Sequence, residues 1–180
     1  MKPSFTSLLF AVATCAFLGC DSQKNAQNAE STESDTQQTA NVAPPEPEKP
    51  KLPNFELTGL DGKTITTASL PTGKPTVIFF FHPNCEHCQA EARELQKHTE
   101  DFANTNFLMV TWDEMRNIRA FMTEYRLNAP IAAYQINSNT LAQTYGQFNL
   151  PAVYIYNANR ELVQQFNGQA KAEAIREYLR

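Results

Sequence analysis

The pattern of hydrophobic and polar positions divides the chain into three segments. Residues 8–18 form a short apolar run, and residues 21–50 contain no aromatic and few aliphatic side chains. Residues 51–180 carry apolar runs and amphipathic stretches separated by polar turns. Only this third segment has enough apolar side chains to offset the entropy lost on folding. We therefore expect one folded domain over residues 51–180.

Strand and helix signals alternate within residues 51–180. We predict strands at 55–57, 76–81, 107–110, 131–136, 153–156 and 161–166, and helices at 86–102, 114–125, 138–145 and 171–180, the third with Ser138 as its N-cap. The run 76–81 is almost entirely apolar, as expected of a central strand covered on both faces. This order predicts an α/β fold with a mixed central sheet flanked by helices on both faces.

The charge of the chain is small and unevenly placed. The 180 residues include 15 Lys or Arg and 19 Asp or Glu, a formal net charge of −4. Six acidic residues and two lysines in residues 21–50 account for that whole charge, so the folded segment is close to neutral. These values exclude a nucleic-acid binder that works through a basic surface. No segment reaches the roughly 18 apolar residues that a membrane-spanning helix needs.

Residues 1–19 have the features of an export signal, since the run 8–18 suits the hydrophobic region of a signal peptide. The run ends in Phe17-Leu18-Gly19-Cys20, which resembles the lipobox of bacterial lipoproteins. The resemblance implies cleavage before Cys20, lipidation of Cys20 and attachment to the membrane through a lipid anchor. An ordinary secretory signal is the alternative. Asp21 resembles an inner-membrane retention signal, so we expect the periplasmic face of the bacterial inner membrane.

Residues 20–50 are expected to form the lipidated cysteine and a disordered tether. The segment is acidic and ends in a proline-rich stretch over residues 43–50. Prolines at this density favour extended conformations without a packed core. We interpret the segment as a spacer between the membrane and the domain.

Two cysteines remain in the predicted domain, Cys85 and Cys88, spaced Cys-x-x-Cys. A disulfide that closes so short a loop adds little stability, so redox chemistry explains the pair better. The pair follows a buried strand and opens a helix, whose N-terminal N–H groups stabilise a thiolate at Cys85. Cys88 lies one turn further and can attack a mixed disulfide at Cys85. We predict that Cys85 is the nucleophile and Cys88 the resolving thiol, and that the two form a redox disulfide.

The domain resembles the thioredoxin superfamily, and most closely its TlpA-like branch of membrane-anchored, extracytoplasmic thiol-disulfide oxidoreductases. The resemblance covers about residues 51–180 and is carried by Pro53-Asn54-Phe55, Gly73-Lys74-Pro75, Cys85-Glu86-His87-Cys88, Tyr145-Gly146 and Leu150-Pro151-Ala152-Val153-Tyr154. It implies a thioredoxin-like fold with an N-terminal strand extension and a central insertion. It also implies a cis peptide bond before Pro151 and pairing of a substrate backbone with Leu150. A proline that merely begins a strand is the alternative.

The dipeptide Glu86-His87 between the cysteines leaves the direction of electron flow open. Many TlpA-like reductases have proline at position 87, whereas histidine there resembles oxidising and isomerising members. A cationic His87 would stabilise the Cys85 thiolate and make the pair a better oxidant, unless it is simply exposed. The TlpA-like resemblance favours a reductant of exported thiol proteins, such as apocytochromes c. It implies a membrane thiol as electron donor, with an oxidant or isomerase as the alternative.

Glu91 stands three residues after Cys88, beside the inward face of the predicted helix. A half-buried carboxylate at this place could raise the pKa values of the thiols or relay the proton of Cys88. A glutamate at the corresponding place lies near the cysteines in some TlpA-like reductases. The alternative is a solvated helix glutamate like Glu94. Residues 112–114 follow a buried strand and could lie near the cysteines, although a surface loop fits equally.

Two other functions would use the same residues. A peroxiredoxin-like peroxidase would have Thr or Ser three residues before the cysteine, where this chain has His82. His82, Cys85, His87 and Cys88 are soft-metal ligand types, and two thiolates could bind copper(I). Copper chaperones, however, usually separate their cysteines by three residues, and a helix start presents too few ligands for structural zinc. We therefore predict no metal and no cofactor.

Overall fold

The computed structural model describes residues 48–179, so the predictions for the signal, for Cys20 and for most of the tether lie outside the described residues. In this part of the chain the strands are β1 (Glu56–Gly59), β2 (Thr64–Thr66), β3 (Thr76–Phe80), β4 (Asn106–Thr111), β5 (Ile131–Gln135), β6 (Ala152–Tyr156) and β7 (Leu162–Asn167). The α-helices are α1 (Glu86–Lys97), α2 (Met115–Glu124), α3 (Ser138–Tyr145) and α4 (Ala172–Glu177), and 3-10 turns span Thr67–Ser69 and Thr99–Phe102. None of these helices has the length and apolar character needed to span a bilayer.

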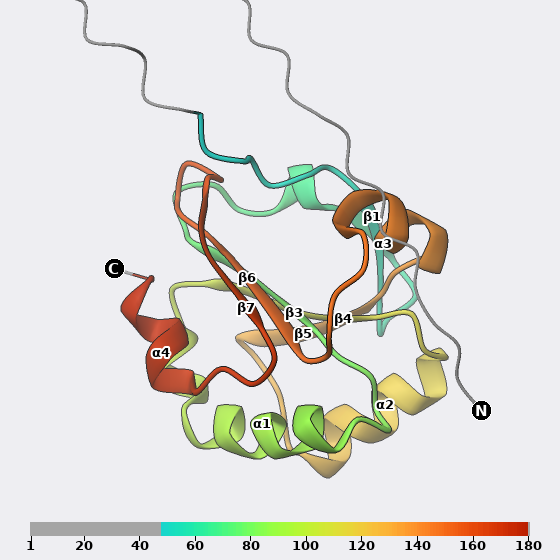
Figure 1. The fold of residues 1–180 in the computed structure, drawn as a ribbon. Helices are drawn as coiled ribbons and strands as arrows, with labels where there is room; N and C mark the ends of the chain where they lie inside the picture. The colour runs from blue at the N-terminus through green and yellow to red at the C-terminus, as the bar shows by residue number, and fades with distance from the viewer. Residues whose placement is uncertain (1–47, 180) are drawn as a thin grey trace, which may run out of the picture. The chain divides into compact units, whose positions relative to one another are not determined.

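The strands form one mixed sheet in the order β2-β1-β5-β4-β3-β6-β7 (Figure 1). The three central strands β3, β4 and β5 are parallel, and the outer strands pair antiparallel. β1 and β2 form the N-terminal extension. Along the chain, β5 and α3 come after α2 and before β6, and they form the central insertion. The predicted fold is confirmed.

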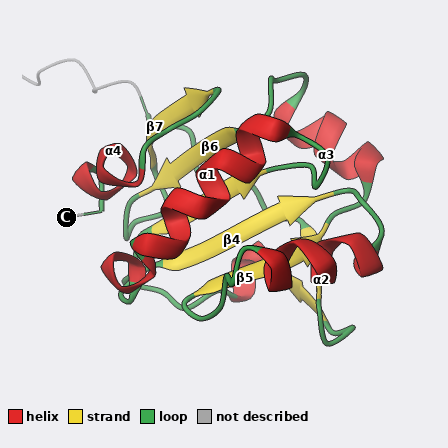
Figure 2. Ribbon diagram, turned by 90° about the horizontal axis from the view of Figure 1, so that it is seen from below, coloured by secondary structure: helices red, strands yellow, loops and turns green. Residues whose placement is uncertain are grey.

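Alternation of side chains along the strands creates two cores. In β3, Phe79 faces a cluster that includes residues of α1, α2 and α4, while Phe80 faces a second cluster that includes Leu141 of α3 and the N-terminal segment. Figure 2 shows α1 and α2 lying across one face of the sheet. Every residue of β3 is buried because both faces are covered, which explains its apolar sequence. The helix that opens at the end of β3 is thus anchored on the most buried strand.

The structure differs from the expected elements at several places. The short strand β2 was not predicted and pairs with β1 through a turn at Gly62, whose φ of +80° favours glycine. The helix expected over 86–102 ends at Lys97, and its last part is the 3-10 turn. The carbonyl of Pro50 accepts a hydrogen bond from the N–H of Leu162 at 2.7 Å, so Pro50 already belongs to the domain rather than to the tether.

The N-cap of α3 is Asn137, and the prediction of Ser138 is wrong. The Asn137 side chain accepts hydrogen bonds from the N–H groups of Asn139 at 2.9 Å and Thr140 at 3.3 Å. We expect Asn137→Ala to lower the free energy of unfolding by about 1 kcal/mol. Ser138→Ala, at the first helical residue, should change it by less than about 0.5 kcal/mol. Urea unfolding of the two variants checks this, and a larger loss for Ser138→Ala would contradict the assignment.

Candidate active site

The site is built where the parallel strands β3 and β4 end at the same edge of the sheet. β3 leads into a turn over residues 82–84, and Cys85 then caps α1. The N–H of Cys85 donates to the carbonyl of His82 at 3.0 Å, and the carbonyl of Cys85 accepts from the N–H of Gln89 at 3.0 Å. The predicted place of Cys85 at the start of a helix is confirmed.

The two cysteines are free thiols with different exposure. Cys85 is half-buried, whereas Cys88 is completely buried. The N–H of Cys88 donates to the Cys85 sulfur at 3.3 Å. Burial raises the pKa of Cys88 far above its ordinary value, and the neighbouring Cys85 and the charge of Glu91 raise it further. Cys85 is therefore the thiol that an external disulfide can reach, and Cys88 is held protonated behind it. Glu86 and His87 are exposed between them.

Glu91 is buried more deeply than the sequence led us to expect, with a relative exposure of 3%. Its Oε1 accepts the N–H of Ala170 at 3.2 Å, whereas its Oε2 has no hydrogen-bond partner among the described residues. Burial raises the pKa of Glu91 to about 8, partly opposed by the N–H of Ala170. The alternative of a solvated helix glutamate is wrong for Glu91, although it holds for the exposed Glu94.

A cavity of about 340 Å³ lies between α1 and the segment that leads from β7 to α4. Glu91, Glu94, Gln169, Ala170 and Lys171 are among the residues that line it. Gln169 Nε2 also donates to the carbonyl of His87 at 3.4 Å, which ties this segment to the first turn of α1. The cavity is large enough to admit water, and Glu94, Gln169 and Lys171 bring polar groups to its lining, which gives a proton carried by Glu91 a route to solvent.

The Leu150–Pro151 peptide bond is cis, as predicted. Ala152 pairs with Phe80 across β6 and β3, so Pro151 lies beside the end of the strand that leads to the cysteines. Pro151 is buried and Leu150 is half-buried. The carbonyl of Pro151 accepts the N–H of Gly168 at 2.8 Å. A second cis bond, Ala129–Pro130, was not predicted. The pairing of Leu150 with a substrate remains a prediction.

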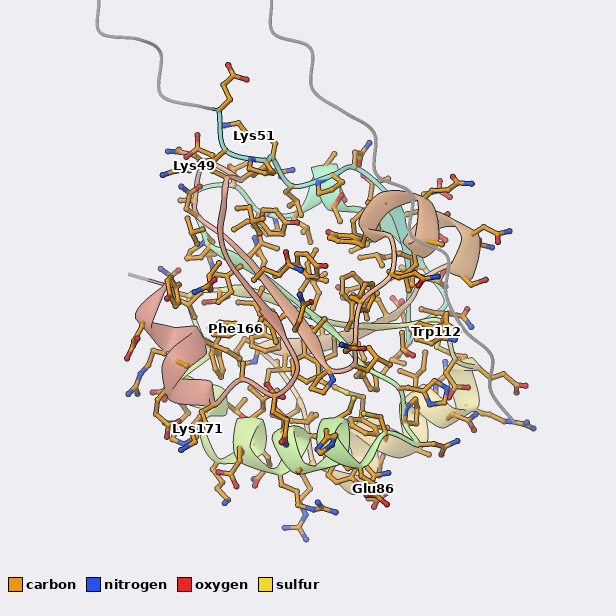
Figure 3. The ribbon with its side chains drawn as sticks, viewed as in Figure 1. Lys49, Lys51, Glu86, Trp112, Phe166 and Lys171 are labelled. Atoms are coloured by element: carbon orange, nitrogen blue, oxygen red, sulfur yellow. The ribbon has the colours of Figure 1, made fainter. Side chains whose placement is uncertain are left out.

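Residues 112–114, which follow β4, lie beside the turn at residues 82–84 (the redox turn). This agrees with the first of the two interpretations of the sequence, that these residues lie near the cysteines. The rings of His82 and Trp112 have centroids 5.7 Å apart, and His82 Nε2 lies 3.5 Å from Asp113 Oδ2. Figure 3 shows Trp112 and Glu86 on the same side of the view. Sequence reasoning missed the contact between His82 and Asp113, although both residues follow the ends of neighbouring strands.

A groove of about 310 Å³ adjoins Trp112. Trp112, Leu141, Ala142 and Phe148 supply most of its apolar lining, together with Ser138, Gly146 and Gln147. Phe148 precedes the cis proline by three residues, which places the groove next to the segment that carries Leu150. Trp112 is 39% exposed, one of two exposed large hydrophobic side chains among the described residues. Neither Phe148 nor the groove was predicted.

The four soft-metal ligand types named from the sequence do not converge. Among residues 48–179 there is no group of three or more His, Cys, Asp or Glu side chains that could hold a metal ion. His82 contacts Asp113, and His87 is exposed on α1.

Comparison with known proteins shows which proteins this chain is similar to. The AhpC/TSA family matches residues 49–165. The thiol-disulfide oxidoreductase ResA of Bacillus thuringiensis is 24% identical over 130 residues, which cover 71% of this chain and 73% of ResA.

Two solved structures are similar to the chain. A secreted disulfide oxidoreductase of Mycobacterium tuberculosis, homologous to DsbE of E. coli, is 26% identical with a TM-score of 0.58, over 68% of this chain and 90% of that one. A thioredoxin family thiol:disulfide interchange protein of Chlorobium tepidum shares the fold, with 17% identity and a TM-score of 0.64 over 75% of this chain and 99% of that one. The chain belongs to the AhpC/TSA family and is a thiol-disulfide oxidoreductase of the thioredoxin superfamily.

Proposed function

We propose that the protein reduces disulfide bonds of protein substrates outside the cytoplasm through Cys85 and Cys88. The observation that carries this proposal is the accessible Cys85 at the start of α1, above the buried pair of Cys88 and Glu91. The Cys85 thiolate attacks one substrate sulfur, the substrate S–S bond breaks, and the leaving thiolate takes a proton from water. Cys88 then loses its proton and attacks the Cys85 sulfur, which releases the second substrate thiol. Two electrons pass to the substrate, and Cys85 and Cys88 end as a disulfide.

Glu91 is the proposed acceptor of the Cys88 proton. The charge of Glu91 contributes to the raised pKa of Cys88, which places the two groups within electrostatic reach. Glu91 accepts a proton only when it is ionised. Because its pKa is about 8, the fraction of molecules with an ionised Glu91 grows as the pH rises toward 8. Water that enters the cavity beside Glu91 then takes up the proton from Glu91.

The buried groups favour a reductant over an oxidant or isomerase. A strong oxidant has a stabilised reduced form, as in DsbA, which usually means a stabilised thiolate. Here the Cys85 sulfur accepts the N–H of Cys88, but the buried Glu91, when ionised, adds a negative charge near the two cysteines that opposes a strongly stabilised thiolate. His87 is exposed, so solvent weakens its effect as a cation.

The test of this function is disulfide exchange with a protein substrate. The reduced protein, freed of small thiols, is mixed with a disulfide-bonded protein, and free thiols are counted on both partners. We expect each reduced substrate disulfide to be matched by one oxidised Cys85–Cys88 pair. Unchanged thiol counts on both partners would contradict the proposal.

The substrate is expected to bind as an extended segment along Leu150, with a large apolar side chain near its cysteine placed in the groove at Trp112. The groove adjoins the cis-proline segment and has an apolar lining, which suits such a side chain. We expect Trp112→Ala to raise KM for a protein disulfide about tenfold and to leave kcat nearly unchanged. Tyr178→Ala is the matched control because Tyr178 is 37% exposed on another part of the domain. Equal KM values for the two variants would contradict the groove's role.

The place of action is proposed from the first 50 residues. The lipobox-like ending at Cys20 supports a lipid anchor, and the relative from Mycobacterium tuberculosis is described as secreted. A membrane thiol protein would supply the electrons that a reductant needs in an oxidising compartment. Cys20→Ser should move the protein from the membrane fraction to the soluble fraction of the host envelope. Retention of the variant in the membrane fraction would contradict lipid anchoring.

A further inference from the structure

The contact between His82 and Asp113 joins the turn before Cys85 to the end of β4. His82 Nε2 lies 3.5 Å from Asp113 Oδ2, and the two side chains are 31% and 12% exposed. The two residues follow neighbouring parallel strands, so a direct contact between them ties the edge of the sheet together where α1 begins. This contact involves neither cysteine, and the exchange steps above do not use it.

Two other atoms of His82 accept hydrogen bonds from backbone N–H groups of the turn. Its Nδ1 accepts the N–H of Asn84 at 3.2 Å, and its carbonyl accepts the N–H of Cys85 at 3.0 Å. Because Nδ1 acts as an acceptor, a neutral imidazole carries its proton on Nε2, which faces Asp113. The same ring therefore receives a hydrogen bond from the redox turn and points an N–H at the neighbouring loop.

Asp113 is a fixed partner for this ring. Its Oδ1 accepts the N–H of Glu114 at 2.6 Å and the side-chain amide of Asn117 at 2.9 Å. Its carbonyl accepts Gln135 Nε2 at 2.8 Å, which links it to β5. These hydrogen bonds hold the carboxylate in place independently of His82, so the carboxylate can orient the imidazole.

We propose that His82 is a positioning residue for Cys85, oriented by Asp113. The ring holds the N–H of Asn84, next to Cys85, so that the turn keeps the Cys85 sulfur at the N-terminus of α1, where the sulfur accepts the N–H of Cys88. The helix N-terminus stabilises the reactive thiolate only while the sulfur remains in that position. The inference rests on the proposed function only in taking Cys85 as the attacking thiol.

Three substitutions separate the two contacts of the ring. His82→Asn keeps an acceptor near the position of Nδ1, His82→Gln keeps a donor near the position of Nε2, and His82→Leu removes both. The readouts are the rate of Cys85 alkylation by iodoacetamide at fixed pH and the equilibrium with glutathione. Both are measured after circular dichroism has shown that each variant is folded.

We expect His82→Leu to slow alkylation of Cys85 about tenfold. We also expect His82→Leu to lower the equilibrium constant for reduction of the Cys85–Cys88 disulfide by glutathione about tenfold. This corresponds to a reduction potential about 30 mV more negative. His82→Asn should restore most of the rate, and Asp113→Asn should lose part of it. His98→Leu is the matched control, because His98 is 29% exposed, contacts Asp101 and Glu173, and caps the C-terminal end of α1, at the other end of the helix from Cys85. It should lower stability and leave the Cys85 rate unchanged.

The assignment is overturned if His82→Leu keeps the wild-type rate and potential, or if His98→Leu slows alkylation equally. It is also overturned if neither His82→Asn nor His82→Gln recovers more than His82→Leu. A wild-type protein whose Cys85 alkylates rapidly but exchanges with no protein disulfide would contradict the proposed function and leave the role of His82 intact.

Discussion

Cys85→Ser is expected to abolish disulfide reduction, with a loss of turnover on the order of 10³-fold or more. Serine has no thiolate to attack a substrate sulfur, and Cys88 cannot replace it because it is buried and its pKa is raised far above the ordinary value. Turnover with a disulfide-bonded protein and a thiol donor measures the effect. Residual turnover within tenfold of the wild type would show that Cys85 is not the nucleophile.

Cys88→Ser should separate the first step from the second. Cys85 still attacks, but no thiol resolves the mixed disulfide, so a covalent adduct between Cys85 and the substrate accumulates. Expressed in the native host, this variant should yield adducts that a reductant dissociates and whose partners identify the substrates. The Cys85→Ser, Cys88→Ser double variant is the control and should yield none. Equal adducts in both variants would contradict the assigned order of attack.

Glu91→Gln is expected to stabilise the protein above pH 6 and to leave it unchanged at pH 4. An unfolded glutamate loses its proton near pH 4.5, whereas the folded Glu91 keeps it until about pH 8. The folded state therefore binds more protons in this window, and the stability contributed by Glu91 is lost as the pH rises through it. Glutamine can accept the N–H of Ala170 without ever ionising. The gain at pH 8 should reach up to about 4 kcal/mol.

Urea unfolding of the wild type and Glu91→Gln between pH 4 and pH 9 tests this difference. Glu94→Gln is the control, because Glu94 is exposed and paired with Lys97, and it should not alter the pH dependence in this window. The same Glu91→Gln variant should also resolve mixed disulfides more slowly, since glutamine cannot accept the Cys88 proton. Parallel stability curves for wild type and variant would contradict the buried state of Glu91.

The elements that depend on local pattern could be predicted from the sequence. The apolar run of β3 and the Cys-x-x-Cys spacing placed Cys85 at a helix start without any tertiary information, because strand burial and helix capping act over a few residues. The cis bond before Pro151 came from family resemblance. The strand β2 escaped prediction because a three-residue Thr-Ile-Thr segment has too short a pattern to be recognised.

Features set by distant contacts could not be predicted in the same way. Glu91 is buried because the segment around Ala170, 79 residues away, closes over it. The contact between His82 and Asp113 depends on the parallel pairing of β3 with β4, and the groove at Trp112 depends on α3. The N-cap of α3 was misplaced because Asn137 and Ser138 are both good capping residues, and only the backbone geometry distinguishes them.

A redox titration of the purified protein in glutathione or dithiothreitol buffers tests the central claim most directly. The oxidised fraction is read as the loss of two alkylatable thiols, Cys85 and Cys88. We predict one two-electron transition with a midpoint closer to about −270 mV, the thioredoxin value, than to about −120 mV, the DsbA value. A midpoint near the DsbA value would contradict the proposed direction. The absence of any reversible transition would contradict redox function itself.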